Sequence, residues 1–249
     1  MTDTNDSSTL VFLHGATGDG QAQFGHLADR FGDRRKVVLP DIAGSGTSTL
    51  SDGPFTLDKV VDEVAAVVDS SGTAPVDLVG FSLGAVVAAA LTAQHPEWIR
   101  RLVLVAGWAS SDARHQLVNS TWARLEQTDP DAFARFGPIL AFSPAFLASM
   151  GDDGIAQVLS GGLPDATGRQ LDLCLRIDIR DQLDQIAAPT LVVGCTQDNL
   201  VPVDHSHTLH DAIAGSRYAE IDCGHAVMFE KPDELTQALR SFLFEDTAN

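Results

Sequence analysis

The residues best suited to chemistry in this chain are a serine, an aspartate and a histidine, each placed where an apolar segment ends. Ser82 stands between two glycines in "GFSLG" (residues 80–84), which fits the pattern G-x-S-x-G. In that pattern a serine sits on a tight turn between a strand and a helix. Its hydroxyl is a poor nucleophile until a neighbouring base removes the proton. The pattern therefore predicts a nucleophile at Ser82 and requires a base and an acid elsewhere in the chain.

Eight histidines are candidates for the base, and their positions separate them. His225 lies in "IDCGHAVMFEKPDEL", directly after the last predicted strand and before the last predicted helix. Loops at the carboxyl ends of parallel strands are where such sheets keep their chemistry, so we assign the base to His225. For His14 we expect a structural role within its own loop. We interpret the other six as solvated or capping residues: His26, His95, His115, His205, His207 and His210.

The orienting acid should lie on another loop at a strand end. Asp198, in "LVVGCTQDNLVP", follows a predicted strand by a few residues and is our choice. Asp222 is the rival, but it lies only three residues before His225, on the predicted strand itself. The resulting order along the chain is Ser…Asp…His, which differs from the order in the chymotrypsin and subtilisin folds.

The elements that must position these residues can be predicted from the hydrophobic pattern. Short apolar runs predict buried strands, and apolar residues at helical spacing predict the helices between them, with Thr56 as an N-cap. Strands that alternate with helices indicate an α/β fold with a mostly parallel sheet. The predicted strands are Ser8–His14, Arg35–Asp41, Pro75–Phe81, Arg101–Gly107, Pro189–Gly194 and Ser216–Asp222, and the predicted helices are Thr56–Asp69, Leu83–His95, Asp204–Ala214 and Asp233–Phe244.

The alternation breaks between Ala109 and Asp184, where aromatic residues lie on helical segments separated by prolines and glycines. We predict an all-helical insertion at 109–184 within a core formed by 1–108 and 185–249. Its aromatic residues can line an apolar pocket, although at least half of them should be core. The residues that we expect in the pocket are Trp108, Trp122, Phe142 and Phe146.

Charge and composition exclude several classes of partner. The chain has 16 basic and 34 acidic residues, a net charge of −18, which argues against binding to nucleic acids and anionic membranes. Three scattered cysteines indicate neither a disulfide framework nor a zinc site. The polar start "MTDTNDSS" does not resemble a signal peptide, and no apolar run is long enough to span a bilayer, so we expect a cytoplasmic protein.

Five motifs in this order resemble those of the α/β-hydrolase fold superfamily, near its esterase and enol-lactonase branch. They are "LVFLHG", "LPDIAGSGTS", "LVGFSLGA", "PTLVVGCTQDNLVP" and "IDCGHAVMFEKPDEL". The resemblance implies Ser82 as nucleophile, His225 as base and Asp198 as acid. It also implies an oxyanion hole made of the backbone N–H groups of Ala16 and Leu83, and a helical cap inserted after the family's sixth strand.

The chain departs from the family's pattern at two places. Only about eight polar residues precede the first predicted strand, so the family's first two strands are missing or rudimentary. Residues 36–39 would then lie near an open sheet edge, and such an edge needs cover, which leaves a monomer or a homodimer as alternatives. The nucleophile position holds serine and not aspartate, which argues against the chemistry of haloalkane dehalogenases and epoxide hydrolases.

The expected function is hydrolysis of a small to medium, largely apolar carboxylic ester or lactone through an acyl-enzyme, with no metal or cofactor. The same triad also serves thioesterases, C–C hydrolases and perhydrolases, and no residue of the sequence separates them. A non-hydrolytic lyase or cyclase, and a ligand-binding protein that retains the triad, are further alternatives. Six arginines of the insertion could include one that binds a substrate carboxylate, and the sequence singles out none of them.

Overall fold

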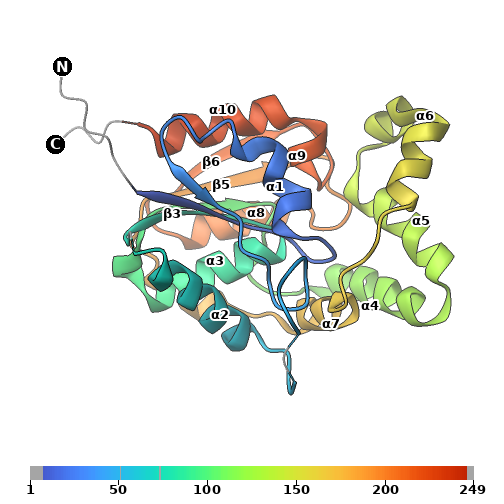
Figure 1. The fold of residues 1–249 in the computed structure, drawn as a ribbon, viewed down its shortest axis with the longest axis horizontal. Coiled ribbons are helices and arrows are strands. Elements are labelled where there is room, and N and C mark those ends of the chain that lie inside the picture. The colour runs from blue at the N-terminus through green and yellow to red at the C-terminus, as the bar shows by residue number, and fades with distance from the viewer. Residues whose placement is uncertain (1–7, 51, 73, 246–249) are drawn as a thin grey trace.

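A computed structural model describes residues 8–50, 52–72 and 74–245, and a parallel sheet of six strands forms its centre (Figure 1). Each strand pairs with its neighbours in parallel register, in the order β2-β1-β3-β4-β5-β6. The α/β fold expected from the sequence is therefore confirmed. The strands are β1 (Thr9–Leu13), β2 (Lys36–Val38), β3 (Val76–Phe81), β4 (Ile99–Val105), β5 (Thr190–Cys195) and β6 (Arg217–Ile221).

The four central strands are buried on both faces, the edge strands β2 and β6 are partly exposed, and alternate residues of each strand lie on alternate faces. In β1, for example, Leu10 and Phe12 belong to one core cluster, whereas Val11 and Leu13 belong to the other. One face is covered by α1 (Gly20–Ala28) and α10 (Pro232–Leu243), and the other by α2 (Leu57–Ser70), α3 (Leu83–Gln94) and α8 (Val203–Ala212) (Figure 1).

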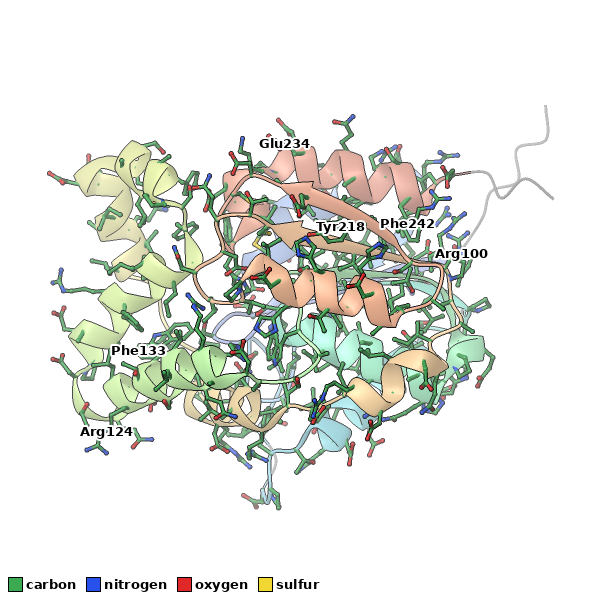
Figure 2. The ribbon with its side chains drawn as sticks, turned by 180° about the vertical axis from the view of Figure 1, so that it is seen from behind. Arg100, Arg124, Phe133, Tyr218, Glu234 and Phe242 are labelled. Carbon is green, nitrogen blue, oxygen red and sulfur yellow. The ribbon has the colours of Figure 1, made fainter. Side chains whose placement is uncertain are left out.

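The segment between β4 and β5 is helical and lies beside one end of the core (Figure 1). Figure 2 shows Phe133 and Arg124 on this segment, well apart from Phe242 and Arg100 on the core. Gly151, with φ of 63°, lies at a kink within the third of its four helices. The division into a core and a cap domain stays a prediction. The four helices are α4 (Ala113–Thr128), α5 (Pro130–Ala141), α6 (Pro144–Leu159) and α7 (Thr167–Arg176).

Several details differ from the expectation. Helix α1 was not predicted, because its apolar positions give only a weak helical pattern after the glycine-rich turn. The second strand is only three residues long, and within the described ranges it forms one edge of the sheet, as expected for residues near an open edge. The remaining short elements are the 3₁₀ turns Pro96–Trp98 and Arg180–Gln185 and the single-turn helix α9 (Val227–Glu230).

The amino end of β3 carries a fully buried carboxylate, Asp77. It accepts hydrogen bonds from Nε of Arg100 at 2.9 Å and Nε of Arg35 at 3.4 Å. A buried charge is tolerated only when it is paired and hydrogen-bonded, and the two guanidinium groups provide this. The cluster fixes the end of β3 opposite to Ser82. No helix within the described ranges has the length and apolarity needed to cross a lipid bilayer.

Candidate active site

Ser82 occupies a strained turn between β3 and α3. Its φ of 54° and ψ of −120° are rare for a residue other than glycine, and such strain concentrates at functional sites. The turn is held by a hydrogen bond of 2.9 Å from the N–H of Ser82 to the carbonyl of Val105. A side chain at Gly80 would collide with the backbone of Gly84 and Ala85 on α3, so the strand and helix can pack this closely only with glycine there.

The structure brings Ser82, His225 and Asp198 together in one buried chain of hydrogen bonds. Nε2 of His225 lies 2.9 Å from Oγ of Ser82, and Nδ1 of His225 lies 2.5 Å from Oδ2 of Asp198. The second oxygen, Oδ1, accepts the N–H groups of Leu200 at 2.8 Å and Val201 at 2.7 Å. The carboxylate is therefore fixed on one side by backbone donors and presents its other oxygen to the imidazole. This is the geometry by which a carboxylate orients a base toward a serine.

The rival carboxylate, Asp222, lies apart from this chain. It is exposed at the surface and accepts hydrogen bonds from Oγ1 of Thr196 and Nε2 of Gln197, both at 2.8 Å. These two bonds lower its pKa. Asp222 therefore serves to hold the loop after β5, whereas Asp198 is the carboxylate that contacts His225.

The loop after β1 has a backbone arrangement suited to binding an oxyanion. The N–H of Gly15 donates to Oε1 of Gln23 at 2.8 Å, and the N–H of Thr17 donates to Oε1 of Gln170 at 2.9 Å. Ala16, between them, lines the same cavity as Ser82. Leu83 is the first residue of α3, where amides have no partner within the helix. The N–H groups of Ala16 and Leu83 therefore remain our prediction for the oxyanion hole.

His14 is a structural residue of this loop, as expected. Its Nδ1 donates to the carbonyl of Gly15 at 2.7 Å, and its Nε2 accepts the N–H of Ile42 at 2.9 Å. These two bonds require a neutral imidazole. Burial lowers the pKa of His14 and so favours the same neutral form.

A cavity of about 300 Å³ adjoins Ser82 and His225 and extends beneath the helical segment. Three of the four predicted pocket residues, Trp108, Trp122 and Phe142, line it. Phe146 is not among its described lining residues; its ring packs against that of Phe142, with centroids 5.3 Å apart. The described part of the lining is mostly apolar and contains no aspartate, glutamate, lysine or arginine. No arginine of the insertion is therefore placed to bind a substrate carboxylate in this cavity.

The interpretation of His115 as a solvated or capping residue was wrong. His115 is 2% exposed and lines the cavity, together with Asn119 one helical turn later on α4. His205 is also largely covered, with 11% of its side chain exposed, and its Nε2 lies 3.4 Å from Oδ2 of Asp112. The i, i+4 spacing of His115 and Asn119 was the available signal, but the helix carries too weak an apolar pattern to reveal which face is buried.

Two further polar residues missed in the sequence fasten the helical segment to the site. Gln170, on α7 and fully buried, holds the N–H of Thr17 and donates to Oγ of Ser45 at 2.9 Å. Glu230, on α9, accepts the N–H of Gly224 beside His225 at 3.0 Å and the N–H of Ser143 at 2.7 Å. Each residue thus joins a loop of the site to the segment that covers it.

The three cysteines are free and buried, and the described ranges contain no cluster of three or more histidine, cysteine or acidic side chains that could hold a metal ion. The groups that the structure brings together at this site are the hydroxyl of Ser82, the imidazole of His225 and the carboxylate of Asp198. A parallel sheet with Ser82 at the turn between β3 and α3, next to His225 and Asp198, is typical of α/β proteins whose nucleophile lies at a strand-to-helix turn.

Comparison with known proteins agrees with that class. The family model for the α/β hydrolase fold matches residues 8–232, so the chain belongs to this family and is an α/β hydrolase. A pyrrolizixenacetamide deacetylase from Xenorhabdus hominickii is 34% identical, with 95% of this chain and 91% of that protein aligned. A pimeloyl-acyl-carrier-protein methyl ester esterase from Neisseria meningitidis is 28% identical, with 96% of this chain and 94% of that protein aligned.

A solved structure shows the same fold. The enol-lactonase from Burkholderia xenovorans LB400 superposes with a TM-score of 0.85 at 23% identity, covering 96% of this chain and 91% of that chain. At this identity, the likeness concerns the fold alone. The names of the two relatives, a deacetylase and a methyl ester esterase, refer to different bonds. The fold therefore does not identify the substrate, and the lining of the cavity is the better guide.

Proposed function

We propose that this hydrolase cleaves a small to medium, largely apolar carboxylic ester or lactone through an acyl-enzyme on Ser82. The observation that carries the proposal is the continuous chain of hydrogen bonds from Asp198 through His225 to Ser82, which ends in a mostly apolar cavity. A cavity of about 300 Å³ suits a small ligand. The helices that cover it act as a cap in this proposal.

In the proposed reaction, Oγ of Ser82 attacks the substrate carbonyl while Nε2 of His225 takes its proton. The negative charge on the carbonyl oxygen is stabilised by the N–H groups of Ala16 and Leu83, and one such donor contributes roughly 3–4 kcal/mol. His225 then protonates the leaving alkoxide, and the acyl group stays on Ser82. Water, activated by the same imidazole, attacks the acyl-enzyme, releases the acid and restores the serine.

A second candidate is hydrolysis of an acetamide. The relative from Xenorhabdus hominickii, which aligns along 95% of this chain, is named as a deacetylase of pyrrolizixenacetamide. The same steps would cleave an amide, provided that His225 protonates the departing amine. Rates on p-nitrophenyl acetate and p-nitroacetanilide compare the two bonds with the same acyl group, and a larger kcat/KM on the anilide would favour the second candidate.

The test of the proposal is turnover of p-nitrophenyl esters with acyl chains of two to ten carbons. We expect the highest kcat/KM on short to medium chains, because longer chains exceed the cavity. A Ser82→Ala variant should lose several powers of ten in kcat on each of them. A variant that retained the wild-type rate would refute the acyl-enzyme, and a thioester panel would identify a preference for that bond instead.

The substrate is a small molecule in this proposal, and the protein acts as a monomer or a homodimer. Within the described part of the chain, β2 pairs with β1 alone and forms an edge of the sheet, and a second copy of the chain could cover this edge. Light scattering of the purified protein measures its mass directly, and a monomeric mass would exclude the dimer.

A further inference from the structure

The cavity contains a second polar position besides Ser82 and His225, formed by His115 and Asn119 on α4. Both side chains line the cavity, and both residues are 2% exposed. Their contacts fix which atoms remain for a ligand. The hydrogen bonds that His115 and Asn119 make with the protein show which of their atoms donate and which accept. The atoms left for a ligand can therefore be classified as donors or acceptors.

The proton on His115 is assigned by its neighbour Ser111. Oγ of Ser111 donates its single proton to the carbonyl of Cys174, at 2.5 Å. The same oxygen accepts the indole N–H of Trp108 at 3.2 Å and lies 3.2 Å from Nδ1 of His115. Since the hydroxyl proton is already used, Nδ1 of His115 must be the donor in this contact. In the neutral imidazole, Nε2 is then a bare acceptor.

His115 is neutral over the ordinary pH range. Burial and, to a smaller degree, the positive charge that His205 can carry lower its pKa to about 4. The ring also packs edge-on against Trp108, with centroids 4.7 Å apart. The imidazole is thus held by packing and by Ser111 in one orientation, with the acceptor nitrogen on its other side.

Asn119 presents an acceptor as well. Its amide group, Nδ2, donates to the backbone carbonyl of His115 at 2.9 Å, which leaves Oδ1 for other partners. Within the described ranges, neither this oxygen nor Nε2 of His115 has a hydrogen bond to the protein. The buried side-chain atoms there that lack both a partner and solvent contact are Ser8 Oγ and Gln182 Oε1. Nε2 of His115 and Oδ1 of Asn119 are not among them, so each atom keeps some accessible surface, and both residues line the cavity.

We propose that His115 and Asn119 form a specificity site for a neutral hydrogen-bond donor, a hydroxyl or an amide N–H, on the substrate. The inference rests on the proposed function, because it assigns the substrate class of the same cavity. Nε2 of His115 and Oδ1 of Asn119 both accept hydrogen bonds, so they favour a ligand group that donates one. The described lining carries no charged side chain, so an ammonium group would be desolvated without a counter-ion. A neutral donor avoids that cost.

The test measures binding to the Ser82→Ala variant by calorimetry, so that it does not depend on turnover. Two pairs of ligands differ only in a donor: 6-hydroxyhexanoate p-nitrophenyl ester against the heptanoate ester, and 4-acetamidophenyl acetate against 4-(2-oxopropyl)phenyl acetate. In each pair a CH₃ or CH₂ replaces the OH or NH. We expect the donor-bearing ligand of at least one pair to bind about tenfold more tightly, as for one good hydrogen bond in a dry site.

Three variants in the Ser82→Ala background identify the source of that preference. His115→Phe and Asn119→Leu each remove one acceptor with little change in shape, and each should reduce the preference at least threefold. His207→Phe makes the same replacement as His115→Phe at a partly exposed histidine outside the cavity and should leave the preference unchanged. Circular dichroism and unfolding curves show which variants are folded, and either folded acceptor variant suffices.

Equal affinities within both pairs would overturn the specificity site, as would the absence of measurable binding of both donor-bearing ligands. A preference that survives in every acceptor variant that folds would overturn it too. Failure of the proposed function has a different signature: the wild-type protein would not hydrolyse any of the four esters, while the donor preference in binding persisted.

Discussion

Replacing Asp198 by asparagine tests how the carboxylate controls the base. Oδ1 of Asp198 accepts two backbone N–H groups, from Leu200 and Val201, at 2.8 and 2.7 Å. An asparagine must keep its amide oxygen on those donors, so its NH₂ group faces Nδ1 of His225 where Oδ2 stood. The imidazole would then have to accept at Nδ1 and carry its proton on Nε2, which points at Ser82. A base that is already protonated toward the nucleophile cannot take its proton.

The size of the effect follows from this change of tautomer. The analogous change in a serine protease lowers kcat about 10⁴-fold, equivalent to about 5.4 kcal/mol of transition-state stabilisation. The fold should be little affected, because both backbone donors keep their acceptor. The assay is kcat on p-nitrophenyl butyrate together with urea unfolding of the same preparation.

Two control variants separate this mechanism from general damage. Asp222→Asn changes an exposed carboxylate that accepts from Thr196 and Gln197, and it should retain nearly full activity. Asp198→Ala removes the acceptor of two buried N–H groups and should destabilise the fold by roughly 1–3 kcal/mol for each of them. Full activity in Asp198→Asn, or a comparable loss in Asp222→Asn, would refute the assignment of the acid.

Four other predictions follow from the described contacts. Asp77→Ala should lower the free energy of unfolding by about 3 kcal/mol, because the paired guanidinium groups of Arg35 and Arg100 lose their buried carboxylate; urea unfolding measures this. The pKa of His115 is about 4 in the folded protein, against the ordinary value of 6.5 in the unfolded chain. Its contribution to the free energy of unfolding is therefore constant above about pH 6.5. As the pH falls to 4, the free energy of unfolding should decrease by up to about 3 kcal/mol. His115→Phe should show a smaller decrease than the wild type, and equal decreases would contradict this. Gln170→Leu should lower kcat about tenfold with little change in KM, since Thr17 loses the partner that holds the Ala16 peptide; an unchanged kcat would show that the loop is held otherwise. Burial raises the pKa of Cys174 to about 12, so iodoacetamide at pH 8 should neither label this cavity-lining thiol nor inhibit the enzyme, as peptide mass spectrometry would show.

The sheet could be predicted, together with Ser82, Asp198 and His225 at the carboxyl ends of its strands, because each leaves a local pattern in the sequence. Apolar β-branched runs identify strands that are buried on both faces, and glycines identify the turn where β3 meets α3. Asp198 follows such a strand, whereas His225 follows β6, which is polar and only partly buried. Both strands are parallel to β3, so the loops at their carboxyl ends converge near Ser82. Placing three strand-end residues required no knowledge of the cavity.

The cavity could not be predicted in the same detail. Phe142 lines the cavity and also packs against Phe146, whereas Phe146 is not among the described lining residues. This difference depends on how the segment lies against the core, which the sequence does not reveal. His115, Asn119 and Gln170 lie on helices whose exposed and buried faces differ little in hydrophobicity, and their burial arises from contacts distant in sequence. For the same reason, their hydrogen-bond partners could not be assigned before the helices were placed.

The most direct test of the account is covalent labelling with a fluorophosphonate, followed by peptide mass spectrometry. A serine activated by His225 should attack the phosphorus, and the label should be found on Ser82 in the wild-type protein. Label should be absent from Ser82→Ala and strongly slowed in Asp198→Asn. A folded wild-type protein that takes up no label, or one labelled at another serine while Ser82 stays unmodified, would contradict the central claim that Ser82 is the nucleophile.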